Sequence, residues 1–128
     1  MSRALISSGG PYEARYGYSR AVVVGDSCWV AGTADVGPDG TALHPADPGA
    51  QATAILAKIE QSLVEAGFSL ADVVRTRMFV TDMAAAGPVL EAHGAVLGAI
   101  RPAATIVEVR ALIDPSLLVE IEADASRS

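Results

Sequence analysis

The segments that decide the fold are residues 101–109, RPAATIVEV, and residues 117–123, LLVEIEA. Both are rich in β-branched residues and are separated by the turn residues Asp114-Pro115, so each is predicted to form a β-strand. In the second strand the two faces alternate: Leu117, Val119, Ile121 and Ala123 on one, and Leu118, Glu120, Glu122 and the next residue, Asp124, on the other. The last strand therefore has one apolar face and one face with three carboxylates.

The N-terminal third predicts strands and turns. Residues 3–8 are expected to form a short first strand, and residues 9–13 (GGPYE) a loop. Two apolar runs, 18–24 and 27–31, flank Gly25-Asp26 and predict a β-hairpin that ends at residues 32–34.

A helix is predicted after a loop over residues 35–48. Asp47-Pro48 supplies a capping carboxylate and a proline in the first turn, and Gly67 supplies the stop. Apolar residues recur at helical spacing between these signals: Ala52, Ile55, Leu56, Ile59 and Leu63. This stripe is expected to face the core.

Residues 73–81 form an alternating strand, and residues 82–97 a second helix that Gly98 closes. The expected strand faces are Val74, Thr76, Met78 and Val80 against Arg75, Arg77, Phe79 and Thr81. The resulting order, β-β-β-α-β-α-β-β, indicates one α+β domain over residues 1–128, with a mixed sheet and two helices on one face. The other face, which includes Phe79, Leu118 and Glu120, is predicted to be a subunit interface because it mixes charge with bulky apolar groups.

Composition narrows the functional class. The chain has 128 residues, of which 51% are hydrophobic and 19% charged, as in globular domains. No apolar run approaches the length that spans a bilayer, and the apolar part of the N-terminus is too short for a signal peptide. A single cysteine, Cys28, allows no intramolecular disulfide, so a cytoplasmic location is expected. The net charge of −6 argues against binding to nucleic acid, and the histidines do not show metal-ligand spacing.

Five motifs in order resemble the Rid family of reactive-intermediate deaminases, also called the YjgF-type or perchloric-acid-soluble-protein family. They are YSRAV at 18–22, AGT at 31–33, AGFSLADVVRT at 66–76, FVTDM at 79–83 and VEIEA at 119–123. The resemblance implies a chorismate-mutase-like fold and a homotrimer with clefts between subunits. It also implies hydrolysis of 2-aminoacrylate and related enamines or imines without metal or cofactor, with Glu120 positioning the attacking water.

The sequence departs from the family pattern at four positions. Ala104 stands where the family has an arginine that binds the substrate carboxylate, Leu90 replaces an asparagine, His93 a tyrosine, and Thr33 a glutamine. Without the arginine, weak or absent hydrolysis of 2-aminoacrylate is expected. The natural substrate is then neutral at that end, larger, or held differently.

Glu120 and Tyr18 are the candidate catalytic residues. Glu120 is expected to activate water, and the alternative is a structural ion pair with Arg75 or Arg77. Tyr18 either closes the cleft and donates its hydroxyl or is an amphipathic interface residue. The backbone N–H groups of Gly32 and Thr33 either hold an anionic oxygen or form a tight turn.

The remaining candidates for substrate binding are His93, Arg101, Ala104 and Thr105. Arg101 is the first substitute for the missing arginine, but its three-residue offset from Ala104 requires a bend at Pro102. His44 is given no role. The sequence thus leaves three hypotheses: an enzyme acting on a small imine, enamine or carbonyl metabolite, a trimer that only binds such a metabolite, and, disfavoured by the charge, a ribonuclease.

Overall fold

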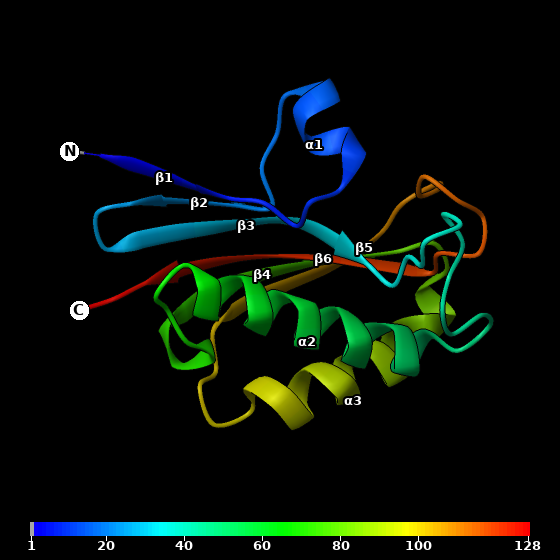
Figure 1. The fold of residues 1–128 in the computed structure, drawn as a ribbon. Coiled ribbons are helices and arrows are strands. Elements are labelled where there is room, and N and C mark those ends of the chain that lie inside the picture. Colours follow the sequence, from blue (N-terminus) through cyan, green and yellow to red (C-terminus); the bar gives the residue numbers. More distant parts are fainter. Residues whose placement is uncertain (1) are drawn as a thin grey trace.

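The computed structural model describes residues 2–128, which form a mixed sheet packed against two long helices (Figure 1). The strands are β1 (Arg3–Ile6), β2 (Ala21–Val24), β3 (Ser27–Ala34), β4 (Val73–Val80), β5 (Ala103–Glu108) and β6 (Val119–Ser126). The helices are α1 (Pro11–Tyr16), α2 (Pro48–Glu65) and α3 (Ala86–Leu97), with short 3-10 turns at Leu70–Asp72 and Met83–Ala85. The predicted α+β class is confirmed.

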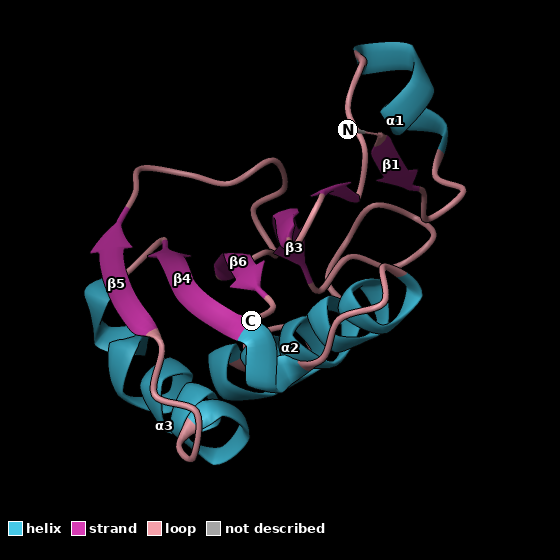
Figure 2. Ribbon diagram, turned by 90° about the vertical axis from the view of Figure 1, so that its left-hand side faces the viewer, coloured by secondary structure: helices cyan, strands magenta, loops and turns pink. Residues whose placement is uncertain are grey.

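Within the described residues the sheet has six strands in the order β1-β2-β3-β6-β4-β5. Only β4 and β5 pair in parallel, because α3 connects them; the other neighbours are antiparallel. The C-terminal strand β6 therefore lies in the middle, between β3 and β4. Figure 2 shows α2 and α3 together on one side of the sheet, so the opposite face lacks a helical layer over β6 and β4.

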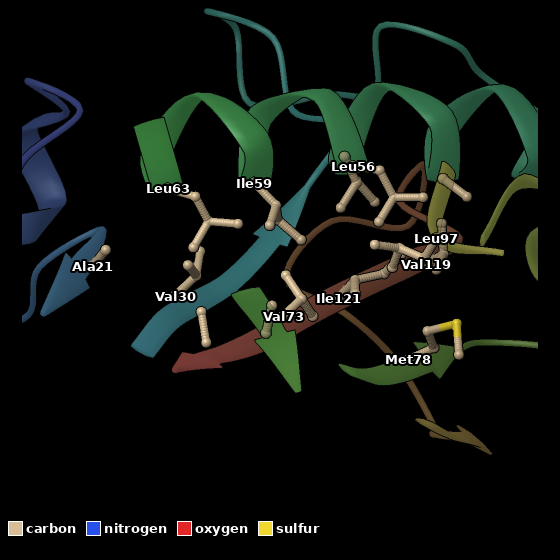
Figure 3. Packing of buried hydrophobic residues seen from close by; sticks show 14 of the residues in the cluster. Ala21, Val30, Leu56, Ile59, Leu63, Val73, Met78, Leu97, Val119 and Ile121 are labelled. Atoms are coloured by element: carbon tan, nitrogen blue, oxygen red, sulfur yellow. The ribbon is translucent and has the colours of Figure 1, made fainter. Parts of the chain in front are cut away.

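The core lies between this sheet and the two long helices. Ile55, Leu56, Ile59 and Leu63 of α2 are buried as predicted, and Figure 3 shows three of them directed at the strands. From the sheet, Met78, Val119 and Ile121 are buried against them. Asp47 caps α2 by accepting a hydrogen bond from the Ala50 N–H at 3.0 Å, as the sequence indicates. None of the helices between residues 2 and 128 is long and apolar enough to cross a membrane.

Two predictions of local structure are wrong. Residues 11–13, assigned to a loop, instead begin α1, in which Pro11 occupies the first turn and Gly17 ends the helix at φ 77°. Figure 1 shows α1 on the side of the sheet opposite α2 and α3. Val74, predicted to share a strand face with Met78 and Val80, is 49% exposed while those two are buried, because a bulge between Val73 and Arg75 shifts the pairing with β6.

The second helix is shorter than predicted. Asp82 caps a 3-10 turn by accepting from the Ala84 N–H at 2.9 Å, and regular α-helix begins only at Ala86. Similarly, the first strand ends at Ile6. The other elements lie within a few residues of their expected positions.

Candidate functional site

A cavity of about 690 Å³ lies on the side of the sheet away from α2 and α3, a size typical of sites for small ligands. Segments far apart in the sequence line it: Tyr12, Tyr18, Arg20, Ala31, Gly32, Ala34, Val36, Asp39, Gly40, Ile113, Asp114, Leu117 and Glu120. A larger hollow of about 900 Å³ lies beside it over Trp29 and Arg77. Only the smaller one contains Glu120 together with Tyr18 and Gly32. It is therefore the candidate site.

Glu120 is a half-buried carboxylate on β6, opposite Ala34 of β3 and Phe79 of β4. Burial raises the pKa of Glu120; Arg20 opposes the rise, and Glu122 adds to it. Among residues 2–128, Glu120 has no ion-pair partner. The predicted alternative, a pair with Arg77, is wrong because Arg77 contacts Glu122 at 3.2 Å and Asp124 at 3.3 Å instead.

Gly32 leaves room for this carboxylate. A Cβ atom at position 32 would lie 2.9 Å from Glu120 Oε2, which is closer than real Cβ contacts allow. A bulge between Val30 and Thr33 interrupts the pairing of β3 with β6 here, so Gly32 belongs to a strand and not to a turn. The backbone thus approaches Glu120 closely at the one position that has no side chain.

Tyr18 and Arg20 form a second wall of the cavity. Tyr18 is 47% exposed, and the Arg20 guanidinium carbon lies 5.9 Å from the centre of its ring. Arg20 Nη2 donates to the carbonyl oxygen of Gly32 at 2.9 Å. Arg20 is not among the candidate residues predicted from the sequence. Its position two residues after Tyr18 is the signal that indicates a shared side.

Thr33 does not line this cavity. Its buried side chain donates from Oγ1 to the Ala31 carbonyl oxygen at 2.9 Å, and it borders a separate hollow of about 410 Å³ near Lys58. His93 is also elsewhere: its Nε2 lies 2.8 Å from Thr76 Oγ1, between α3 and the sheet. Burial lowers the pKa of His93, which favours the neutral imidazole.

Ala104 and Thr105 lie on β5, at the edge of the sheet, and Arg101 precedes this strand. Ala104 pairs with Thr76 and so shares the helix side, whereas Thr105 pairs with Arg77 on the open side. Two strand spacings, about 10 Å, separate β5 from β6. Arg101 is exposed, with φ 56° immediately before Pro102. Within one chain, therefore, these residues and His93 do not meet Glu120.

His44 has a partner that the sequence did not indicate. Its Nδ1 lies 2.9 Å from the buried carboxylate of Asp35, which also accepts from the His44 N–H at 2.8 Å. Nothing in this pair faces the Glu120 cavity directly. No cluster of three or more His, Cys, Asp or Glu side chains suited to a metal ion occurs among the described residues.

A family model described as Endoribonuclease L-PSP matches residues 11–127. The uncharacterized protein SCO2049 of Streptomyces coelicolor is 31% identical and aligns over 95% of this chain and 90% of its own.

Solved structures agree with the fold. Rv2704 of Mycobacterium tuberculosis, described as a member of the YjgF/YER057c/UK114 family, is 48% identical over 98% of this chain and 100% of its own, with a TM-score of 0.89. TdcF of Escherichia coli, solved with bound serine, is 27% identical over 97% of this chain and 94% of its own, with a TM-score of 0.78.

Proposed function

Because the chain belongs to the Endoribonuclease L-PSP family, also known as the YjgF/YER057c/UK114 or Rid family, we propose that it is a small-molecule hydrolase or tautomerase. Its substrate is a reactive imine, enamine or carbonyl metabolite. Its site is the Glu120 cavity, completed by a neighbouring subunit. The observation that carries the proposal is Glu120 itself, a half-buried carboxylate without an ion-pair partner among residues 2–128 and at the wall of a cavity.

Glu120 acts as the general base in this proposal. A water molecule loses a proton to the Glu120 carboxylate as its oxygen bonds to the imine carbon, and the nitrogen takes up a proton. Glu120 then gives the proton it holds to the amino nitrogen, the C–N bond breaks and ammonia leaves. The former water oxygen loses its second proton to solvent, which replaces the proton that the nitrogen first took up, and becomes the carbonyl oxygen. An enamine first takes a proton on its terminal carbon and becomes the imine. Tyr18 supplies a hydroxyl beside the reacting atoms.

Hydrolysis of imines made in place by an amino-acid oxidase tests the proposal. The amount of imine that semicarbazide can trap should fall faster with the protein than without it. Two other results would replace the proposal. A ligand such as serine, bound in the TdcF crystal structure, could raise Tm without being consumed, which would indicate a binding protein. Degradation of RNA would instead support the endoribonuclease named in the family description.

We propose a homotrimer, and sedimentation equilibrium should give three times the chain mass. The open face of the sheet carries exposed apolar residues such as Trp29, 47% exposed, and Val107, 40% exposed, as subunit interfaces do. In addition, His93, Arg101 and Ala104 contribute to the Glu120 site only if a second copy brings them there. A monomeric mass throughout the micromolar range would contradict both the trimer and the shared cleft.

Activity on 2-aminoacrylate is expected to be weak, and Ala104→Arg is expected to raise kcat/KM. A bidentate pair with the substrate carboxylate contributes on the order of 2–3 kcal/mol, or roughly 30- to 150-fold. Ala104→Lys is the matched control, because lysine adds the same charge at the same position but lacks the planar fork, so it should raise kcat/KM less. Robust wild-type activity that Ala104→Arg does not improve would show that another residue holds the carboxylate.

A further inference from the structure

We propose that Arg20 is an anion-binding residue of the Glu120 cavity and that the cavity takes small carboxylate metabolites through it. This inference rests on the proposed function for the choice of cavity, but it concerns the ligand and not the reaction. No carboxylate of the described residues lies within ion-pairing distance of Arg20. The chain therefore places an arginine at a cavity wall without giving it an ion pair.

The hydrogen bonding of Arg20 is incomplete. A guanidinium has five N–H donors, and one nitrogen, Nη2, donates to the Gly32 carbonyl oxygen at 2.9 Å. Nε is buried and has no hydrogen-bond partner among residues 2–128. Because Nε is closed off from solvent, the donors that a ligand in the cavity can reach are those of the terminal nitrogens, whose one hydrogen bond among residues 2–128 is that of Nη2 to Gly32.

The charged side chains near Arg20 form hydrogen bonds with other groups and not with Arg20. The positive charge of Arg20 contributes to lowering the pKa of Glu13, but the Glu13 carboxylate accepts its hydrogen bonds from the Ser8 backbone N–H and hydroxyl. Lys58 donates to the carbonyl oxygens of Ala34 at 2.9 Å and Val36 at 3.2 Å. Arg20 donates one hydrogen bond to Gly32 and so supports the β3 bulge. The other N–H groups at the end of the guanidinium remain available to a ligand.

The surroundings favour a carboxylate over a phosphate. Besides Glu120, Asp39 and Asp114 line the cavity, so a dianion would meet more repulsion than a monoanion. The planar fork of a guanidinium matches the two oxygens of a carboxylate. Tyr18 covers the guanidinium from one side and limits the directions from which a ligand approaches.

Arg20 and Glu120 both lie next to Gly32, whereas Ala104 of the same chain lies on β5 at the edge of the sheet. A carboxylate on Arg20 is therefore held next to Glu120 by the same chain, and not at the position of the family arginine that Ala104 replaces. Binding of carboxylates at Arg20 is thus compatible with slow hydrolysis of 2-aminoacrylate.

Calorimetric titration of the full chain with pyruvate and with pyruvamide, its uncharged amide, tests the inference. The wild type should bind pyruvate at least roughly 10-fold more tightly than pyruvamide, as one charge-assisted pair allows. Arg20→Gln should abolish this preference. Arg15→Gln, the same change at an exposed residue of α1, should keep it, and so should Arg101→Gln. An equal affinity of the wild type for both probes, or a preference that Arg20→Gln retains or that Arg101→Gln removes, overturns the inference.

A measurement on the wild type covers the case in which Arg20→Gln does not fold. Saturating pyruvate should move the ¹⁵N-resolved Nε–H resonance of Arg20, and pyruvamide should not. A resonance that pyruvate leaves unmoved overturns the inference. Turnover is measured separately on imines: a protein that prefers pyruvate through Arg20 but consumes no imine keeps this inference and loses the proposed reaction. A protein that consumes imines without preferring carboxylates keeps the proposed reaction and overturns this inference.

Discussion

Replacing Glu120 by glutamine is expected to lower turnover by roughly 100- to 10,000-fold, the usual contribution of a positioned general base. The substitution keeps the shape of the side chain but removes the negative charge that accepts the proton. Because Glu120 has no ion-pair partner among the described residues, the change breaks no pair, and Tm should stay within a few degrees of the wild type. Steady-state kinetics beside a thermal melt measure both effects.

Glu122→Gln is the matched control on the same strand face. Glu122 pairs with Arg77 at 3.2 Å and both side chains are partly exposed, so its loss should cost less than about 1 kcal/mol. Because Glu122 contributes to the raised pKa of Glu120, turnover should be unchanged at a pH well above that pKa. If Glu120→Gln lowers Tm strongly while activity survives, Glu120 is a structural residue and the proposed base is wrong.

The pH dependence of the wild type follows from the same carboxylate. Only the ionised form accepts a proton, and burial raises the pKa of Glu120, so activity should fall as the pH drops through that raised pKa. The stability of the fold should instead increase as the pH drops through the same range. Above the raised pKa the buried charge destabilises the fold, and below the unfolded pKa the cost is absent. Glu120→Gln should therefore be slightly more stable than the wild type at neutral pH, and this gain should vanish in acid.

Elements whose signals are local could be predicted from the sequence. The alternation of β6 places Val119, Ile121 and Ala123 in the core and leaves Glu120 outside it, as expected. The capping carboxylate of Asp47 and the stripe of α2 are equally local. These signals suffice because each depends only on residues a few positions apart.

The site depends on residues that meet across the chain. The bulges that expose Val74 and free Gly32 arise from pairing with β6, some 50 and 90 positions later in sequence, and no local pattern indicates them. Helix α1 is too short for a periodic pattern, and its Gly-Gly-Pro start resembles a turn. Arg20 received no role because its unpaired Nε becomes visible only when Gly32 is placed beside it.

Gln51 also makes contacts with residues far along the chain that no local pattern indicates. Its replacement is expected to have the largest effect on stability. Although polar, it is 0% exposed on α2. Its Nε2 donates to the carbonyl oxygens of His44 at 3.1 Å and Ser116 at 3.0 Å, and its Oε1 accepts from the Leu118 N–H at 2.9 Å. One amide thus holds together the loops that carry Asp39, Gly40, Ile113 and Asp114 into the Glu120 cavity.

Gln51→Leu should lower the free energy of unfolding by about 3 kcal/mol, because it leaves two carbonyls and one N–H unpaired at about 1–3 kcal/mol each, less what water restores. At about 4 °C per kcal/mol for a chain of this size, Tm should fall by roughly 10 °C. Melts of both proteins at equal chain concentration measure this, since assembly makes Tm depend on concentration.

Gln61→Leu is the matched control, since Gln61 is exposed on the same helix and should change stability by less than about 0.5 kcal/mol. Gln51→Glu separates the two halves of the amide: it keeps an acceptor for Leu118 but loses both donations, so it should also be destabilising. Hydrogen exchange at the Leu118 amide should quicken in Gln51→Leu and remain slow in Gln61→Leu, because only the former removes its acceptor. Equal melting temperatures for the two leucine variants would show that water replaces the amide, and that the cavity loops do not depend on Gln51.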